Sequence, residues 1–123
     1  MTLIDGLHHI QIAAPRGSEP VLRQFYANVL GLTEVAKPSL LAARGGAWFK
    51  GPGLELHIGI EEPFAPARKA HPGFLVSDLD ALAERLTAAG FEITPADPAE
   101  LPGYRRFHSH DPVGNRLEFI SPS

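Results

Sequence analysis

The sequence contains no cysteine among its 123 residues. Disulfide bonds, thiolate metal ligands and cysteine nucleophiles are therefore excluded. The chain also lacks a long apolar run, a secretory leader pattern at its N-terminus and any cluster of basic residues. Together with a net charge of −3, these absences predict a cytoplasmic protein that binds neither nucleic acid nor a membrane.

The composition is that of an ordinary globular domain, with 44% hydrophobic and 20% charged residues. A chain of this length can build one hydrophobic core of useful size. We therefore expect a single domain over residues 1–123.

Alternating and helical patterns divide the chain into two similar halves. The pattern of the first half predicts one strand, one helix and three further strands, at 7–14, 18–30, 32–36, 40–50 and 54–60. A connector rich in proline and mixed charge follows at 61–70. The second half predicts the same order of elements, at 72–76, 77–90, 91–95, 104–110 and 116–120.

A histidine and a glutamate recur at matching places in the two halves. His9 and His71 each stand at or just before the first strand of a half, 62 residues apart. Glu55 and Glu118 open the last strand of each half, 63 residues apart. Such a recurrence indicates a duplicated module, so the sequence predicts an α+β fold of two tandem modules.

The polar face of the predicted strands concentrates imidazole and carboxylate groups. Side chains two residues apart on a strand share a face, and two amphipathic helices are available to cover the apolar faces. The opposite face then collects six residues, namely His9, Glu55, His57, Arg106, His108 and Glu118. Taken singly, each of them is typical of a solvated sheet face. As a set they offer the nitrogen and carboxylate ligands that Zn, Ni, Mn or Fe prefer, which favours a divalent metal site.

Five stretches carry a more specific pattern: LHHIQIA, RQFYANVLGL, GLELHI, AHPGFLVSDLDAL and FHSHDPVGNRLEFI. They resemble motifs of the vicinal oxygen chelate superfamily, also called the glyoxalase/bleomycin resistance/dioxygenase superfamily, and together they span about residues 7–121. The resemblance implies two βαβββ modules, at about 7–60 and 71–121, whose mixed sheets curl around a central metal cavity. It also implies a small-molecule substrate and a cavity that a homodimer partner often completes.

The resemblance further implies a set of metal ligands. Three ligands common in the family match His9, His71 and Glu118, and a fourth ligand, found in glyoxalase I, matches Glu55. All four positions are filled, which favours the branch of the family that moves a proton. His57 is an additional ligand-type side chain that departs from the pattern.

The stretch GLELHI therefore carries two residues with different predicted roles. In the repeat, Glu55 is the counterpart of Glu118, whereas His57 corresponds to Ile120. We predict Glu55 as a metal ligand and possible base, and His57 as its neighbour, which orients a ligand or contacts the substrate.

The favoured function is a glyoxalase-like, metal-dependent lyase or isomerase that binds its substrate through two neighbouring oxygens. Glu55 and Glu118 are the candidate catalytic carboxylates, because a carboxylate loosely held by a metal can take or return a proton. We expect Arg106 and His108, like His57, to contact the substrate or to orient ligands.

Two alternatives to this function stay open. One is a fosfomycin-type thiol transferase or a ring-cleaving dioxygenase that uses the same His-His-Glu set. The other is a bleomycin-resistance-like protein that sequesters a drug without catalysis. The four filled ligand positions argue against sequestration, and the short chain argues against a dioxygenase.

Overall fold

A computed structural model describes all 123 residues of the chain. The chain forms two four-stranded sheets, each built by one half of the sequence. In each sheet the first and last strands of the half are parallel neighbours, and the other pairs are antiparallel. The prediction of an α+β fold with two βαβββ modules is confirmed. No helix in the chain has both the length and the apolar composition that a membrane crossing requires.

Module 1 supplies the first sheet, in the order β1-β4-β3-β2. Its elements are β1 (Ile10–Ala14), α1 (Glu19–Arg23), the π-helix η1 (Gln24–Val29), β2 (Thr33–Val35), α2 (Ser39–Ala42), β3 (Ala47–Gly51) and β4 (Leu54–Ile60). The prediction of a strand at 54–60 is confirmed, but the prediction at 40–50 is wrong in its first part. Pro38 instead starts the short helix α2, and Gly45 and Gly46 adopt positive φ angles before β3 begins.

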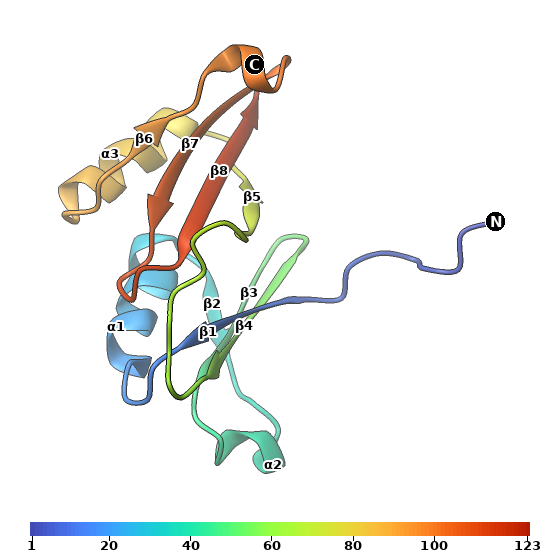
Figure 1. Cartoon of the computed structure of the whole chain (residues 1–123), viewed down its shortest axis with the longest axis vertical. Helices are drawn as coiled ribbons and strands as arrows, with labels where there is room; N and C mark the ends of the chain where they lie inside the picture. The colour runs from blue at the N-terminus through green and yellow to red at the C-terminus, as the bar shows by residue number, and fades with distance from the viewer.

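The first strand is also shorter than predicted. The ladder between β1 and β4 begins at Ile10, opposite Leu56, rather than at residue 7. Residues 1–9 form an exposed arm that projects away from the body of the molecule (Figure 1). The arm carries exposed apolar side chains, at Leu3, Ile4 and Leu7.

Module 2 supplies the second sheet, in the order β5-β8-β7-β6. Its elements are β5 (Gly73–Leu75), α3 (Leu79–Ala88), β6 (Thr94–Pro95), the 3-10 helix η2 (Pro98–Glu100), β7 (Tyr104–His110) and β8 (Arg116–Pro122). The helix α3 is capped by Asp78, whose side chain accepts a hydrogen bond from the backbone N–H of Ala81 over 3.0 Å.

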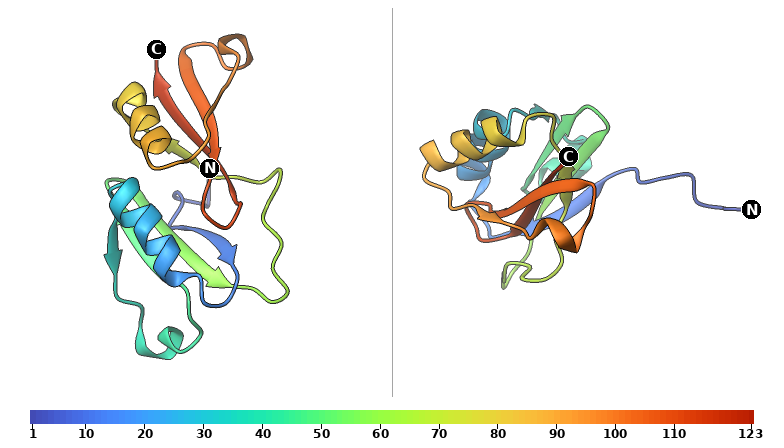
Figure 2. Two further views of the ribbon diagram at one scale, coloured as in Figure 1. Left: turned by 90° about the vertical axis from the view of Figure 1, so that its left-hand side faces the viewer. Right: turned by 90° about the horizontal axis from the view of Figure 1, so that it is seen from above.

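The helices cover the apolar faces of the sheets and leave the other faces open. Figures 1 and 2 show α1 and α3 on the same side of the molecule. Buried side chains on the helices are Leu22, Phe25, Tyr26, Val29, Leu79 and Leu86. They pack with alternate residues of the strands in one core, so the polar residues of each strand point to the opposite face.

A buried polar network connects the two modules. The hydroxyl of Tyr26 in η1 donates a hydrogen bond to Asp111 Oδ2 over 2.7 Å. Asn115 Nδ2 donates to the same oxygen over 3.1 Å and to the carbonyl of Ala13 in β1 over 2.8 Å. Burial, followed by the charge and hydrogen bond of Asp111, raises the pKa of Tyr26 well above its usual value of 10.0. The network therefore joins the β7–β8 turn of module 2 to module 1 through buried hydrogen bonds.

Candidate metal centre

Three side chains of module 2 converge on the open face of its sheet, and we call them the module 2 group: His71, His108 and Glu118. The ladder between β7 and β8 pairs His108 with Glu118, and His71 lies two residues before β5. The Nε2 atoms of His71 and His108 lie 2.9 and 3.4 Å from Glu118 Oε1. Elements distant in the sequence thus bring two imidazoles to one carboxylate oxygen.

The ring of His71 is held in an orientation that suits a metal ligand. Its Nδ1 lies 2.8 Å from the carbonyl oxygen of Lys69. A carbonyl can only accept a hydrogen bond, so Nδ1 carries the proton. The ring is thereby held with Nε2 toward Glu118 Oε1, and Nε2 is the nitrogen that would face a metal bound beside this carboxylate.

Glu118 is ionised and shares its two oxygens between different partners. Arg106 Nη1 lies 3.6 Å from Oε2, while both histidines face Oε1. Burial raises the pKa of Glu118, but the hydrogen bond with His71 and the positive charge of Arg106 together outweigh it. The pKa of Glu118 is therefore lower than its usual 4.5, and the group is a carboxylate at neutral pH.

The surroundings of His108 favour its neutral form. Burial lowers the pKa of His108 below its usual 6.5, and the nearby charge of Arg116 lowers it further, against the opposite effect of Glu118. A neutral imidazole has a free nitrogen lone pair, which is the form that binds metals.

Four side chains gather on the open face of module 1, and we call them the module 1 group: His9, Trp48, Glu55 and His57. The rings of His9 and His57 stack with centroids 4.0 Å apart, and the ring of Trp48 covers the other side of His57 at 3.8 Å. His57 is only 5% exposed. Its Nε2 lies 3.3 Å from Glu55 Oε1, so one imidazole contacts all three other members.

Glu55 is also a carboxylate at neutral pH. The hydrogen bond with His57 is the largest effect on the pKa of Glu55 and lowers it below its usual 4.5. Burial is the second-largest effect and raises the pKa of Glu55, while the charges of Lys50 and His8 lower it further.

The six polar-face residues lie on the predicted faces, but they form two groups rather than one. Arg106, His108 and Glu118 lie together and are joined by His71. No hydrogen bond, ion pair or ring stacking connects the module 1 group with the module 2 group.

Sequence reasoning missed two contributors to the site. Trp48 alternates with the core residue Phe49, and the alternation alone did not predict that its indole stacks on His57. The carbonyl of Lys69 belongs to the connector and carries no side-chain signal.

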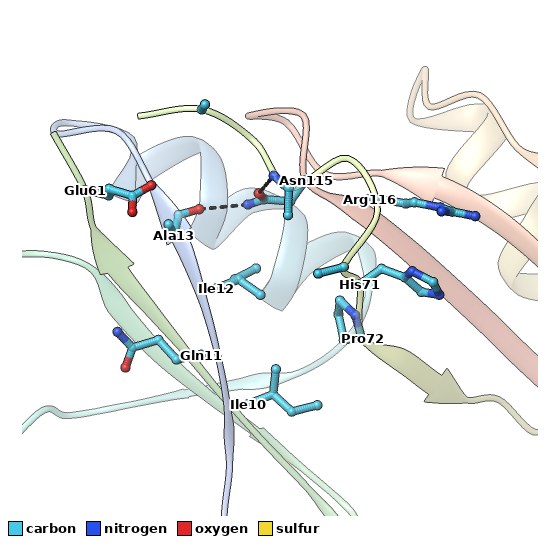
Figure 3. A pocket seen from close by; sticks show the side chains of 12 residues that line it. Ile10, Gln11, Ile12, Ala13, Glu61, His71, Pro72, Asn115 and Arg116 are labelled. Carbon is cyan, nitrogen blue, oxygen red and sulfur yellow. Dashed lines mark hydrogen bonds between the residues drawn. The ribbon is translucent and has the colours of Figure 1, made fainter. Parts of the chain in front are cut away.

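A cavity of about 470 Å³ lies between β1 and the connector, at the border of the module 2 group. Figure 3 shows Ile10 and Ile12 on one side of it and Pro72 on the other. The His71 ring points away from these side chains, toward the strand that carries Arg116. The cavity therefore adjoins the site through the backbone of His71 and Pro72.

The module 2 group fits a divalent metal by both chemistry and spacing. Two ligand atoms that each lie about 2.1 Å from one ion are about 3.0 Å apart at a right angle and about 3.4 Å apart at a tetrahedral angle. The distances from Glu118 Oε1 to the two histidines are 2.9 and 3.4 Å. Two neutral imidazoles and one carboxylate are ligands that Zn, Ni, Mn and Fe accept.

Comparison with protein-family models gives a match over residues 6–119, to the Glyoxalase/Bleomycin resistance protein/Dioxygenase superfamily. The chain belongs to this superfamily. Members of the superfamily bind small molecules, often form dimers and typically use a divalent metal, and this chain holds a His-His-Glu group that can bind one. No curated protein matches the chain.

Solved structures of the superfamily share the fold along the whole chain. A glyoxalase family protein from Bacillus anthracis is 42% identical, with a TM-score of 0.94 over 100% of this chain and 99% of that one. The fosfomycin resistance protein FosX from Listeria monocytogenes is 20% identical, with a TM-score of 0.76 over 98% and 96%. Lactoylglutathione lyase from Agrobacterium tumefaciens is also 20% identical, with a TM-score of 0.73 over 98% and 96%. The likeness to the last two establishes the fold alone.

Proposed function

We propose that the protein is a glyoxalase-like, metal-dependent lyase or isomerase that acts on a small molecule in the cytoplasm. The observation that carries the proposal is the arrangement of His71 and Glu118, with the His71 tautomer fixed by the Lys69 carbonyl. The Lys69 carbonyl orients the His71 ring, and Nε2 lies 2.9 Å from Glu118 Oε1, so the two ligand atoms are close enough to share one ion. A divalent ion between the two side chains satisfies both groups.

We propose that a homodimer completes the site, with module 1 of one chain facing module 2 of the other. His9 is exposed and has no ligand-type neighbour from module 2. Both β1 and β5 are edge strands, and unpaired edges invite association with another chain. Apolar side chains are exposed on the arm and on β5, including Leu3, Leu7 and Leu75. A second copy of the chain would bury them, which also supports the homodimer.

In the proposed site, His71 and Glu118 of one chain would hold the metal together with His9 and a side chain of β4 from the other. The bound ion would polarise two neighbouring oxygens of the substrate as a Lewis acid. Glu55 would accept a proton from the adjacent carbon, because its carboxylate is ionised and is oriented by His57, and would then return the same proton to the neighbouring carbon. Glu118, whose carboxylate is also ionised, would be the alternative proton acceptor. Arg106 supplies a positive charge next to the site and favours an anionic substrate.

Metal content and turnover test the proposal together. We expect purified protein to contain one divalent metal per chain, as measured by mass spectrometry of the elements. Chelation should abolish turnover in a screen of methylglyoxal–thiol adducts, fosfomycin and catechols, and metal should restore it. A protein that contains no divalent metal, and takes none up when it is offered, would contradict the proposal and favour a drug-binding role.

A further inference from the structure

The N-terminal arm concentrates large apolar side chains that the chain itself leaves uncovered. They are Met1, Leu3, Ile4 and Leu7, and each of them is at least 78% exposed. Residues 1–7 belong to no helix or strand and form no hydrogen bond with the body of the molecule. Segments that stay solvated are usually poor in large apolar residues. The composition of the arm therefore indicates that it is buried against another surface.

An apolar groove lies on the side of the molecule from which the arm projects. The groove has a volume of about 250 Å³ and lies between β5, α3 and β8 of module 2 and Leu54 of module 1. Eight of its nine lining residues are hydrophobic, among them Phe74, Leu75 and Leu82. Leu75 is 80% exposed, and β5 has no neighbour on its outer edge. Figure 1 shows β5 and the β3–β4 turn on the same side as the arm.

The size of the groove matches the side chains of the arm. An apolar cavity of about 150 Å³ holds a molecule of benzene. A groove of about 250 Å³ can therefore take aliphatic side chains such as those of Leu3 and Leu7. The free edge of β5 can accept an extended segment beside the groove, because its outward backbone groups are unpaired.

The charges of the arm and of the groove are complementary. Asp5 lies between the apolar residues of the arm. Arg85 follows Leu82 by one turn of α3, and both residues line a small pocket that adjoins the groove. Neither Asp5 nor Arg85 forms an ion pair within the chain. An arm placed in the groove can therefore bring a free carboxylate to a free guanidinium.

We infer that the arm of one chain occupies the apolar groove of a second copy, and that the exchange is reciprocal. The inference rests on the homodimer of the proposed function and names the contact that holds it together. Figure 1 and the right-hand view of Figure 2 show the arm leading away from the body of its own chain. Because arm and groove lie on the same side, one two-fold axis there places each arm against the groove of the other chain.

The exchanged surface is large enough to matter for a stable dimer. Burying one aliphatic side chain removes on the order of 100 Å² from water. Each chain offers four such side chains on its arm and Leu75 at its groove. Two chains therefore bury on the order of 1,000 Å² through the arms alone, whereas stable interfaces bury about 1,200–2,000 Å².

Disulfide cross-linking tests the exchange directly, because the chain has no cysteine of its own. We combine Leu75→Cys with Leu3→Cys in one variant and with Leu7→Cys in another. At least one of the two should form a covalent dimer on a non-reducing gel after mild oxidation. The matched control combines the same arm substitution with Leu40→Cys, since Leu40 is 88% exposed but lies on α2, outside the groove. We expect at least about 10-fold less covalent dimer in the control, because only a bound arm has a high effective concentration at its target.

Two results of the cross-linking would overturn the inference. A disulfide within one chain, which leaves a monomer on the gel, would mean that the arm covers its own groove. Covalent dimer no more abundant than in the control would mean that the arm does not reach the groove.

Sedimentation of a second pair of variants measures the contribution of the arm without any cross-link. The double substitution Leu3→Ser/Leu7→Ser should raise the dissociation constant of the dimer at least about 10-fold, because each dimer then loses four buried apolar side chains. Leu40→Ser is the matched control and should dimerise like wild type. Circular dichroism checks that both variants keep the fold. An unchanged dissociation constant in the double variant would overturn the inference.

Failure of this inference is distinguishable from failure of the proposed function. A cross-linked dimer that takes up no divalent metal would leave the arm exchange standing and remove the metal-dependent activity. Metal-dependent turnover by a protein whose arm does not cross-link to the groove would do the reverse.

Discussion

Replacing Glu118 with glutamine is expected to lower the affinity for a divalent metal at least about 100-fold. Glu118 supplies the one carboxylate in the module 2 group, and both histidines of the group face its Oε1. Glutamine keeps the size of the side chain but removes the negative charge, so the two histidines would retain only a weak neutral neighbour. The positive charge of Arg106, which would then keep Glu100 as its ion-pair partner but no longer face a carboxylate at the site, would further repel the ion.

Calorimetric titration of metal-free protein with Zn²⁺ or Co²⁺ measures this loss directly. Glu84→Gln is the matched control, because Glu84 is exposed on α3 and forms no ion pair. The control should bind metal like wild type. Equal affinities for Glu118→Gln and the control would mean that Glu118 is not a metal ligand.

Replacing Gly46 with alanine is expected to lower the free energy of unfolding by about 2–5 kcal/mol. Gly46 has a φ of +85°, which L-residues rarely adopt, and an added Cβ would lie 2.0 Å from the carbonyl oxygen of Ile58. That oxygen belongs to the backbone of β4, so relief requires β3 and β4 to separate. The backbone N–H of Gly46 also donates to Glu19 Oε2 over 3.0 Å, and the movement would weaken this bond.

Urea unfolding of Gly46→Ala and Gly53→Ala separates the steric effect from the backbone effect. Gly53 also has a positive φ, at +64°, but an added Cβ there would meet no atom within 4 Å. We expect Gly53→Ala to cost only about 1 kcal/mol, from backbone strain. A loss of the same size in both variants would refute the close approach of Gly46 to Ile58.

The sequence predicted the elements best where two signals agreed. Residues 54–60 alternate cleanly between apolar and polar side chains and follow a glycine-rich turn, and β4 matches this range. The strand β7 also matches its predicted range, 104–110, where the strong turn signal at 111–115 marks its end although the alternation is incomplete. At 40–50 the run LLAARGGAWFK has apolar residues without a clean alternation, and Pro38 starts a helix that a period-two pattern cannot reveal.

Two motif stretches turn out to have a structural role. Tyr26 of the RQFYANVLGL stretch and Asp111 and Asn115 of the DPVGN stretch form the buried network between the modules. Nothing in either stretch alone predicts this contact, because the two lie 85 residues apart in the chain. Their resemblance to the superfamily therefore predicts the fold more directly than it predicts the reaction.

The sequence predicts on which face of its sheet each candidate residue lies, but it does not predict which of these residues contact one another. Alternation correctly placed His9, His57, His108 and Glu118 on the open faces of the sheets. It could not predict that the residues divide into two groups, because that depends on how the modules sit in space. Nor could it predict that His57, and not Glu55, is paired with β1, since both lie on one face of β4.

Mixed dimers test most directly whether a metal site takes His9 from one chain and Glu118 from the other. His9→Ala and Glu118→Gln proteins are each expected to lose tight metal binding. After unfolding and refolding together, half of the dimers contain one chain of each kind, and each such dimer has one intact site. Titration should then recover about a quarter of the tight sites of wild type. A mixture that recovers none, while both variants refold, would contradict the shared site.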